Sequence, residues 1–234
     1  MSAIAPGRVL CGLTLVLGAG ASMVSPPAPI GGVRVTGRIT MLEKHNKPSP
    51  DLGNAVVYLE DATPPSLRPG AFEIATSDKE FVPRVVVVPL GSTVRFPNHD
   101  PFEHNVFSVS EPNAFDLGRY GRGEAKGHRF MSAGLVRVFC NVHPRMVAFI
   151  HVMATPYVTQ PEADGEFAIE RVPPGPYTLH VWHERSAEVT RPLTVGTAAP
   201  ADLTVELDAR RFHWVAHKNK DGEDYPTNAG LERY

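Results

Sequence analysis

The chain has 234 residues, of which 42% are hydrophobic and 21% are charged, and its formal net charge at pH 7 is −2. These values indicate a globular protein with a hydrophobic core, long enough for one large β domain or two small ones, and exclude a general affinity for nucleic acid. The 23 prolines and 20 glycines interrupt the chain so often that many short strands are favoured over long helices.

The first 21 residues are predicted to be a signal peptide. Arg8 supplies a positive charge, residues 9–17 form a short apolar run, and Ala19-Gly20-Ala21 is a small-residue cleavage site. The apolar run is too short to span a bilayer. We therefore expect a periplasmic or secreted protein with no transmembrane segment after cleavage.

Two strands are predicted before the first proline-rich segment. Residues 33–41 alternate between apolar and polar side chains, which is typical of a half-buried strand. Residues 54–60 contain a continuous apolar run at residues 55–59, which is typical of a strand buried on both faces. Residues 63–70 hold three prolines and end this pattern.

A second group of strands follows the prolines. Strands are predicted at residues 84–88, 93–96, 135–139 and 147–152. Residues 113–127 contain four glycines and are predicted to be irregular. The last two strands flank a tight loop.

This loop carries Cys140, His143 and Met146 in the spacing Cys-x-x-His-x-x-Met. Thiolate, imidazole and thioether are the donors that copper uses in a trigonal site with a weak axial Met. Such a site needs a second His. His104 opens an apolar strand that would hold its ring, whereas His99 lies among turn residues, so we favour His104 and keep His99 as the alternative.

These residues resemble the ligand pattern of the cupredoxins, the small blue-copper β-sandwich proteins. The short loop and the distant His104-Asn105 pair are most similar to the amicyanins, since plastocyanins have a longer gap before the Met. The resemblance covers residues 81–153. It implies a Greek-key sandwich that binds one copper ion through His104, Cys140, His143 and an axial Met146. It also implies that Asn105 ties the two ligand loops together by hydrogen bonds.

The cysteine count agrees with a metal site. Cys11 would leave with the signal peptide, so the mature chain would carry Cys140 alone and no internal disulfide. A bound metal explains such a thiol, and the alternative is a small buried hydrophobe.

The part after Met153 has a different character. Residues 164–179 read D-G-x-F-x-I-x-x-V-P-P-G-x-Y-x-L, and strands are also predicted at residues 191–195 and 203–207. The motif is similar to the later strands of transthyretin-like domains of the carboxypeptidase-regulatory kind. Gly37-Arg38-Ile39 and residues 55–59 are similar to the opening strands of such domains.

We therefore predict an all-β chain in which a cupredoxin domain, residues 72–155, is inserted in a transthyretin-like sandwich formed by residues 33–62 and 156–208. Such an insertion is tolerated because loop-closure entropy rises slowly with length. The alternative is that residues 33–60 supply the first strands of the cupredoxin. Residues 209–234 are predicted to be a polar tail, either on the surface or disordered.

The function that these features favour is electron transfer by an exported mononuclear copper protein. The alternatives are a copper delivery or storage protein, and an interaction module with a structural copper. No carboxylate pair, Ser-His-Asp order or glycine-rich phosphate loop suggests an enzyme.

The pairs His180/His183 and His213/His217 are weaker candidates for a second metal site. Basic residues outnumber acidic ones between residues 115 and 150, which predicts an acidic redox partner; they are Arg119, Arg122, Lys126, Arg129, Arg137 and Arg145, against Asp116 and Glu124.

Overall fold

The computed structural model describes residues 32–60, 67–198 and 202–226. The predicted signal peptide, its cleavage site and the end of the tail lie outside these residues. No helix among the described residues is long and apolar enough to cross a membrane.

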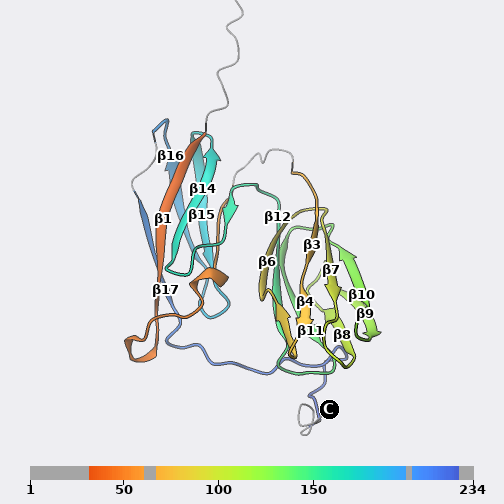
Figure 1. Ribbon diagram of the computed structural model, residues 1–234. Helices are drawn as coiled ribbons and strands as arrows, with labels where there is room; N and C mark the ends of the chain where they lie inside the picture. Colours follow the sequence, from red (N-terminus) through yellow and green to blue (C-terminus); the bar gives the residue numbers. More distant parts are fainter. Residues whose placement is uncertain (1–31, 61–66, 199–201, 227–234) are drawn as a thin grey trace, which may run out of the picture. The chain divides into compact units, whose positions relative to one another are not determined.

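The described chain is all-β, as predicted (Figure 1). Its only helical elements in the described ranges are two single 3₁₀ turns, η1 (Lys44–Asn46) and η2 (Leu52–Asn54). The strands are β1 (Val33–Leu42), β2 (Val56–Glu60), β3 (Ala71–Glu73), β4 (Ala75–Ser77), β5 (Glu80–Val82), β6 (Val85–Pro89), β7 (Thr93–Pro97), β8 (His104–Ser108), β9 (Phe115–Tyr120), β10 (Ala125–Arg129), β11 (Gly134–Cys140), β12 (Val147–Met153), β13 (Val158–Thr159), β14 (Glu166–Val172), β15 (Gly175–Trp182), β16 (Val189–Val195) and β17 (Leu203–Asp208).

The first and last strands of the chain pair with one another. They form a three-stranded sheet in the order β14-β1-β17 and a four-stranded sheet in the order β13-β2-β15-β16. Their apolar side chains share one core, which includes Ile39, Leu59, Phe167 and Leu179. Among the described strands, β1 and β2 pair only with β13, β14, β15 and β17. In the described chain, residues 33–60 therefore pair with strands that follow Met153 and not with the strands between β3 and β12.

The middle strands form the sheets that carry the predicted ligands. The largest sheet has the order β6-β12-β11-β8-β9, and a smaller one has the order β10-β7-β3. Their core is separate and includes Phe96, Val106, Val138 and Ile150. A third apolar cluster joins the outer face of β12 to the other sheets through Val56, Val85, Val147, Phe149 and Trp182.

The expectation of an irregular segment at residues 113–127 is wrong. This segment contains β9, which pairs with β8, and β10, which pairs with β7. The apolar alternation is hidden for two reasons. The register between β8 and β9 shifts between Asn105 and Phe107, and β10 places the polar side chains of Lys126 and His128 at its half-buried positions. Gly118 takes a positive φ of 66° within β9, a conformation that few other residues adopt without strain.

Candidate metal centre

The metal centre lies where neighbouring strands of the largest sheet end. β11 ends at Cys140 and β8 begins at His104, and the two strands pair with Cys140 opposite Val106. The loop from β11 to β12 then carries His143. Antiparallel pairing therefore brings together residues that are far apart in the sequence.

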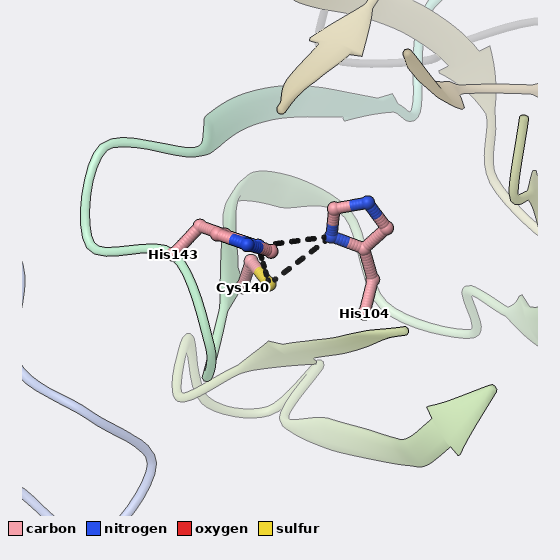
Figure 2. A group of neighbouring side chains, drawn as sticks. All are labelled: His104, Cys140 and His143. Carbon is pink, nitrogen blue, oxygen red and sulfur yellow. Dashed lines mark hydrogen bonds between the residues drawn. The ribbon is translucent and has the colours of Figure 1, made fainter. Parts of the chain in front are cut away.

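The donor atoms of these three residues lie close enough to share one ion. The Sγ atom of Cys140 is 3.6 Å from Nδ1 of His104 and 3.7 Å from Nδ1 of His143, and the two Nδ1 atoms are 3.2 Å apart. Figure 2 shows dashed lines that join the Cys140 sulfur and one nitrogen of each imidazole ring. Cys140 and His104 are fully buried, and His143 is 6% exposed.

These separations can be tested against the size of a metal ion. The point equidistant from the three donor atoms lies about 2.0 Å from each of them. Bonds from a divalent metal to imidazole nitrogen and thiolate sulfur are about 2.0–2.3 Å long. A ligand set of one sulfur and two imidazoles suits copper. The residues present therefore fit a copper ion.

Hydrogen bonds close the loop that follows Cys140. The Cys140 amide donates to the carbonyl of Met146 at 3.4 Å, and the Met146 amide donates to the carbonyl of His143 at 3.1 Å. The amide of Val142 donates to the Cys140 sulfur at 3.4 Å. Met146 is 1% exposed and belongs to the same core cluster as Cys140. The predicted axial ligand is thus held in the loop of Cys140 and His143.

The imidazole of His104 is held by a carboxylate that the sequence did not point to. Oδ2 of Asp100 lies 2.8 Å from Nε2 of His104, and both side chains are buried. Asp100 also accepts the amides of Asp78 and Lys79, at 2.7 and 3.1 Å. These two residues form the turn between β4 and β5 with positive φ values of 55° and 61°. The carboxylate therefore fixes the His104 ring with Nδ1 toward the sulfur.

Asn105 connects the two ligand segments, as the resemblance implies. Its carbonyl accepts the amide of Asn141, the residue after Cys140, at 2.9 Å. Its side-chain amide instead donates to Oδ1 of Asp116 on β9, at 2.6 Å. The backbone of Asn105, and not its side chain, makes the direct link between the loops.

Burial sets the protonation of the free donors. It raises the pKa of the Cys140 thiol, against the opposing effect of nearby backbone amides and of Arg119. It lowers the pKa of His104, although Asp100 acts in the opposite direction. Without a metal the site therefore favours a neutral thiol and a neutral imidazole, and neither carries a charge that the low-dielectric core would oppose.

The structure keeps His99 and His180 apart from this site. His99 is exposed, and only its amide is held, by the carbonyl of Thr76. His180 stacks on Tyr58 and faces the carboxylates of Glu60 and Glu188. Within the described ranges, the only group of His, Cys, Asp and Glu side chains arranged to hold a metal ion is His104, Cys140 and His143.

The basic residues near the centre differ in their surroundings. Arg145, inside the ligand loop, is exposed and its guanidinium lies 5.9 Å from the ring centroid of Trp214. Lys126 is partly buried and donates to two backbone carbonyls of β9. Nη1 of Arg119 lies 3.8 Å from Oε2 of Glu103. Arg145 is thus a charge of the ligand loop itself that a partner can reach.

No family model and no curated protein matches the chain. Among solved structures, it is similar to a purple cupredoxin from Nitrosopumilus maritimus, with 23% identity over 35% of this chain and 99% of that chain and a TM-score of 0.32. A reduced Cu(I) form of a mutant amicyanin is 21% identical over 42% of this chain and 98% of that chain, with a TM-score of 0.34. A copper-containing nitrite reductase (NirK) from Thermus scotoductus SA-01 is 22% identical over 49% of this chain and 28% of that chain, with a TM-score of 0.35. The solved structures similar to this chain thus include cupredoxins and a copper-containing enzyme, each aligned with less than half of it.

Proposed function

We propose that this chain is a mononuclear type 1 copper protein that carries electrons between redox partners. The observation that carries the proposal is the buried triangle of one sulfur and two imidazole nitrogens, whose size suits a single ion. Copper bound there would exchange one electron between Cu(I) and Cu(II).

Each ligand residue has a distinct role. Cys140 would bind as the thiolate, losing its proton to make the strongest bond of the site. His104 and His143 would bind copper through Nδ1, and Met146 would be a weaker fourth ligand that tunes the potential. Because strand pairing and Asp100 already hold the donors in place, little rearrangement would accompany a change of oxidation state.

The burial of the donors favours an electron carrier over an enzyme. Cys140 is fully buried and His143 is 6% exposed, so a substrate has no direct access to the sulfur. A nucleophilic cysteine needs both access and a lowered pKa, whereas the pKa of Cys140 is raised. An electron can reach a buried metal through the protein, but a substrate atom cannot.

Voltammetry combined with a release assay tests this function against copper delivery. A carrier gives a reversible one-electron wave and keeps Cu(I) on the timescale of many turnovers. A delivery protein transfers Cu(I) readily to a chelating acceptor. An irreversible wave together with rapid release would contradict the carrier function, and Cys140→Ser provides the matched protein without the thiolate.

We also propose export of the chain and an acidic protein partner. Export rests on the signal-like residues 1–21, and the partner rests on the basic residues around the ligand loop, including the exposed Arg145. Attraction between opposite charges speeds encounter and is screened by salt. Arg145→Glu should slow electron uptake from a negatively charged protein donor at low salt, whereas Arg34→Glu on β1 should not. A rate that does not change with salt would contradict the acidic partner.

A further inference from the structure

The chain segment after β17 extends to the loop that carries the ligands. The hydroxyl of Tyr225 donates to the carbonyl of Cys140 at 2.7 Å. The amide of Lys220 donates to Oδ1 of Asn141 at 2.8 Å. Residues about 80 positions away in the sequence thus bind the backbone of Cys140 and the side chain of the next residue.

Lys220 also closes a ring of hydrogen bonds. Its Nζ atom lies 2.7 Å from Oδ2 of Asp116, and Oδ1 of Asp116 accepts the side chain of Asn105 at 2.6 Å. The carbonyl of Asn105 accepts the amide of Asn141 at 2.9 Å, and Asn141 in turn accepts the amide of Lys220. The ring therefore contains Asn105, which follows His104 on β8, and Asn141, which follows Cys140 at the end of β11.

Aromatic packing holds the same segment against the two strands. The ring of His217 stacks on Phe139 of β11, with centroids 4.4 Å apart and an angle of 27°. It also meets Phe107 of β8 at 6.2 Å and Tyr225 at 5.3 Å. The strands that deliver Cys140 and His104 are thus covered together by one segment.

The segment has a structure of its own. Oδ1 of Asn219 accepts the amides of Asp221 and Glu223, and Lys218 pairs with Asp224 at 2.8 Å. Gly222 completes the turn with a positive φ of 82°. Lys220 lies in this local turn and Tyr225 follows it, and both bond to the ligand loop.

We propose that Lys220 and Tyr225 are positioning residues of the metal centre, and that residues 217–225 act as a clamp on its two ligand segments. The inference rests on the proposed function. Hydrogen bonds outside the ligand set restrict how far each ligand can move, and their removal loosens metal binding. By joining Asn105, Asp116 and Asn141, Lys220 keeps β8 and the end of β11 at the separation that the ion requires.

The test compares variants of the full chain loaded with copper. Lys220→Met removes the bond to Asp116, and Tyr225→Phe removes the bond to Cys140. Lys220→Arg can still pair with Asp116. Lys218→Met is the matched control, because it removes the same charge from the same segment and loses only an exposed ion pair with Asp224, outside the ring of hydrogen bonds. The measurements are the rate of Cu(I) loss to a bicinchoninate chelator and the position and relative intensity of the Cu(II) charge-transfer bands.

Lys220→Met should release Cu(I) about tenfold faster than wild type and shift the charge-transfer bands, with both effects restored by Lys220→Arg. Tyr225→Phe should accelerate release about fivefold, as the loss of one hydrogen bond predicts. The proposal would be overturned if Lys220→Met and Tyr225→Phe released Cu(I) no faster than Lys218→Met and kept the charge-transfer bands unchanged.

Hydrogen exchange of the metal-free proteins separates this proposal from the proposed function. The amide of Asn141 lies inside the ring, so it should exchange about tenfold faster in Lys220→Met than in Lys218→Met. That difference would support the clamp even if the wild-type protein held no blue copper. Equal exchange in the two variants would overturn the clamp while leaving the function untouched.

Discussion

Nε2 of His104 lies 2.8 Å from Oδ2 of Asp100, and neither side chain is more than 6% exposed. The carboxylate accepts a hydrogen bond from the N–H group at Nε2 and leaves Nδ1 as the atom that faces Cys140. The tautomer and the orientation of the ring are thus both set by one buried hydrogen bond.

Asp100→Asn should therefore weaken copper binding. One amide oxygen cannot replace the two carboxylate oxygens that hold His104 and the Asp78-Lys79 turn. We expect the affinity for Cu(II) to fall about tenfold in a competition titration. His99→Ala is the control, because that side chain is exposed and should leave the affinity unchanged. Equal affinities for Asp100→Asn and wild type would refute the role of Asp100.

Met146→Leu should keep the colour of the copper site and shift its reduction potential. The bond from a thioether would be weak, so binding through Cys140, His104 and His143 would survive its loss, but the balance between Cu(I) and Cu(II) would change. Voltammetry of the two proteins is the measurement. Met131→Leu is the matched control, since that methionine is 65% exposed. An identical potential for wild type and Met146→Leu would show that Met146 is not a ligand.

The clustering of His104, Cys140 and His143 could be predicted because it depends on local signals. The strands on either side of residues 140–146 are strongly apolar, and the spacing of the donors is a property of one loop. The preference for His104 over His99 followed from the apolar strand that it begins, and the structure brings His104, not His99, to Cys140.

The supporting residues could not be predicted, since they depend on contacts between distant parts of the chain. Lys220 and Tyr225 lie in a polar segment with no strand pattern, and their partners become neighbours only after the sheets form. Asp100 was four residues before a proposed ligand, but a carboxylate at that spacing is informative only if it is buried. The strands that begin within residues 113–127 were missed because a register shift interrupts the pairing of β9 and because polar side chains occupy the half-buried positions of β10.

The buried side chain of His151 should make the free energy of unfolding depend on pH. It packs against Trp182, with ring centroids 4.4 Å apart, and burial lowers its pKa to about 4. The unfolded chain takes up a proton near pH 6.5 but the folded chain does not, so the free energy of unfolding falls as the pH drops from 6.5 to 4. This residue accounts for a loss of up to about 3 kcal/mol.

His151→Phe should make that decline shallower by up to about 3 kcal/mol, because the variant has no proton to gain at this position. Urea unfolding of the metal-free proteins at a series of pH values between 7 and 4 measures the difference. Parallel stability profiles for the two proteins would contradict a buried neutral His151.

The discontinuous arrangement of domains stays a prediction that excision can test. A fragment of residues 69–155 contains β3 to β12 and their own core, so it should fold and melt cooperatively. The start precedes the predicted residue 72 because β3 begins at Ala71 and Gly70 bonds to Ser92. Excision exposes Val147 and Phe149, so the melting temperature should be lower than in the full chain.

The complementary protein joins Asp61 to Tyr157 through a short Gly-Ser linker and should fold as a copper-free β-sandwich. Its strands β1, β2 and β13 to β17 retain all of their sheet partners. If either protein fails to show a cooperative melt, the two groups of sheets are one folding unit and not an insertion.

The most direct test of the copper assignment is the visible spectrum of the purified protein with one equivalent of Cu(II), compared with that of Cys140→Ser. Charge transfer from the thiolate to copper should make the wild-type protein intensely blue or green, and the variant should lose this band. His104→Ala should lose the band as well. A wild-type protein that binds Cu(II) without the band, or a Cys140→Ser variant with an unchanged spectrum, would contradict a type 1 copper centre at these residues.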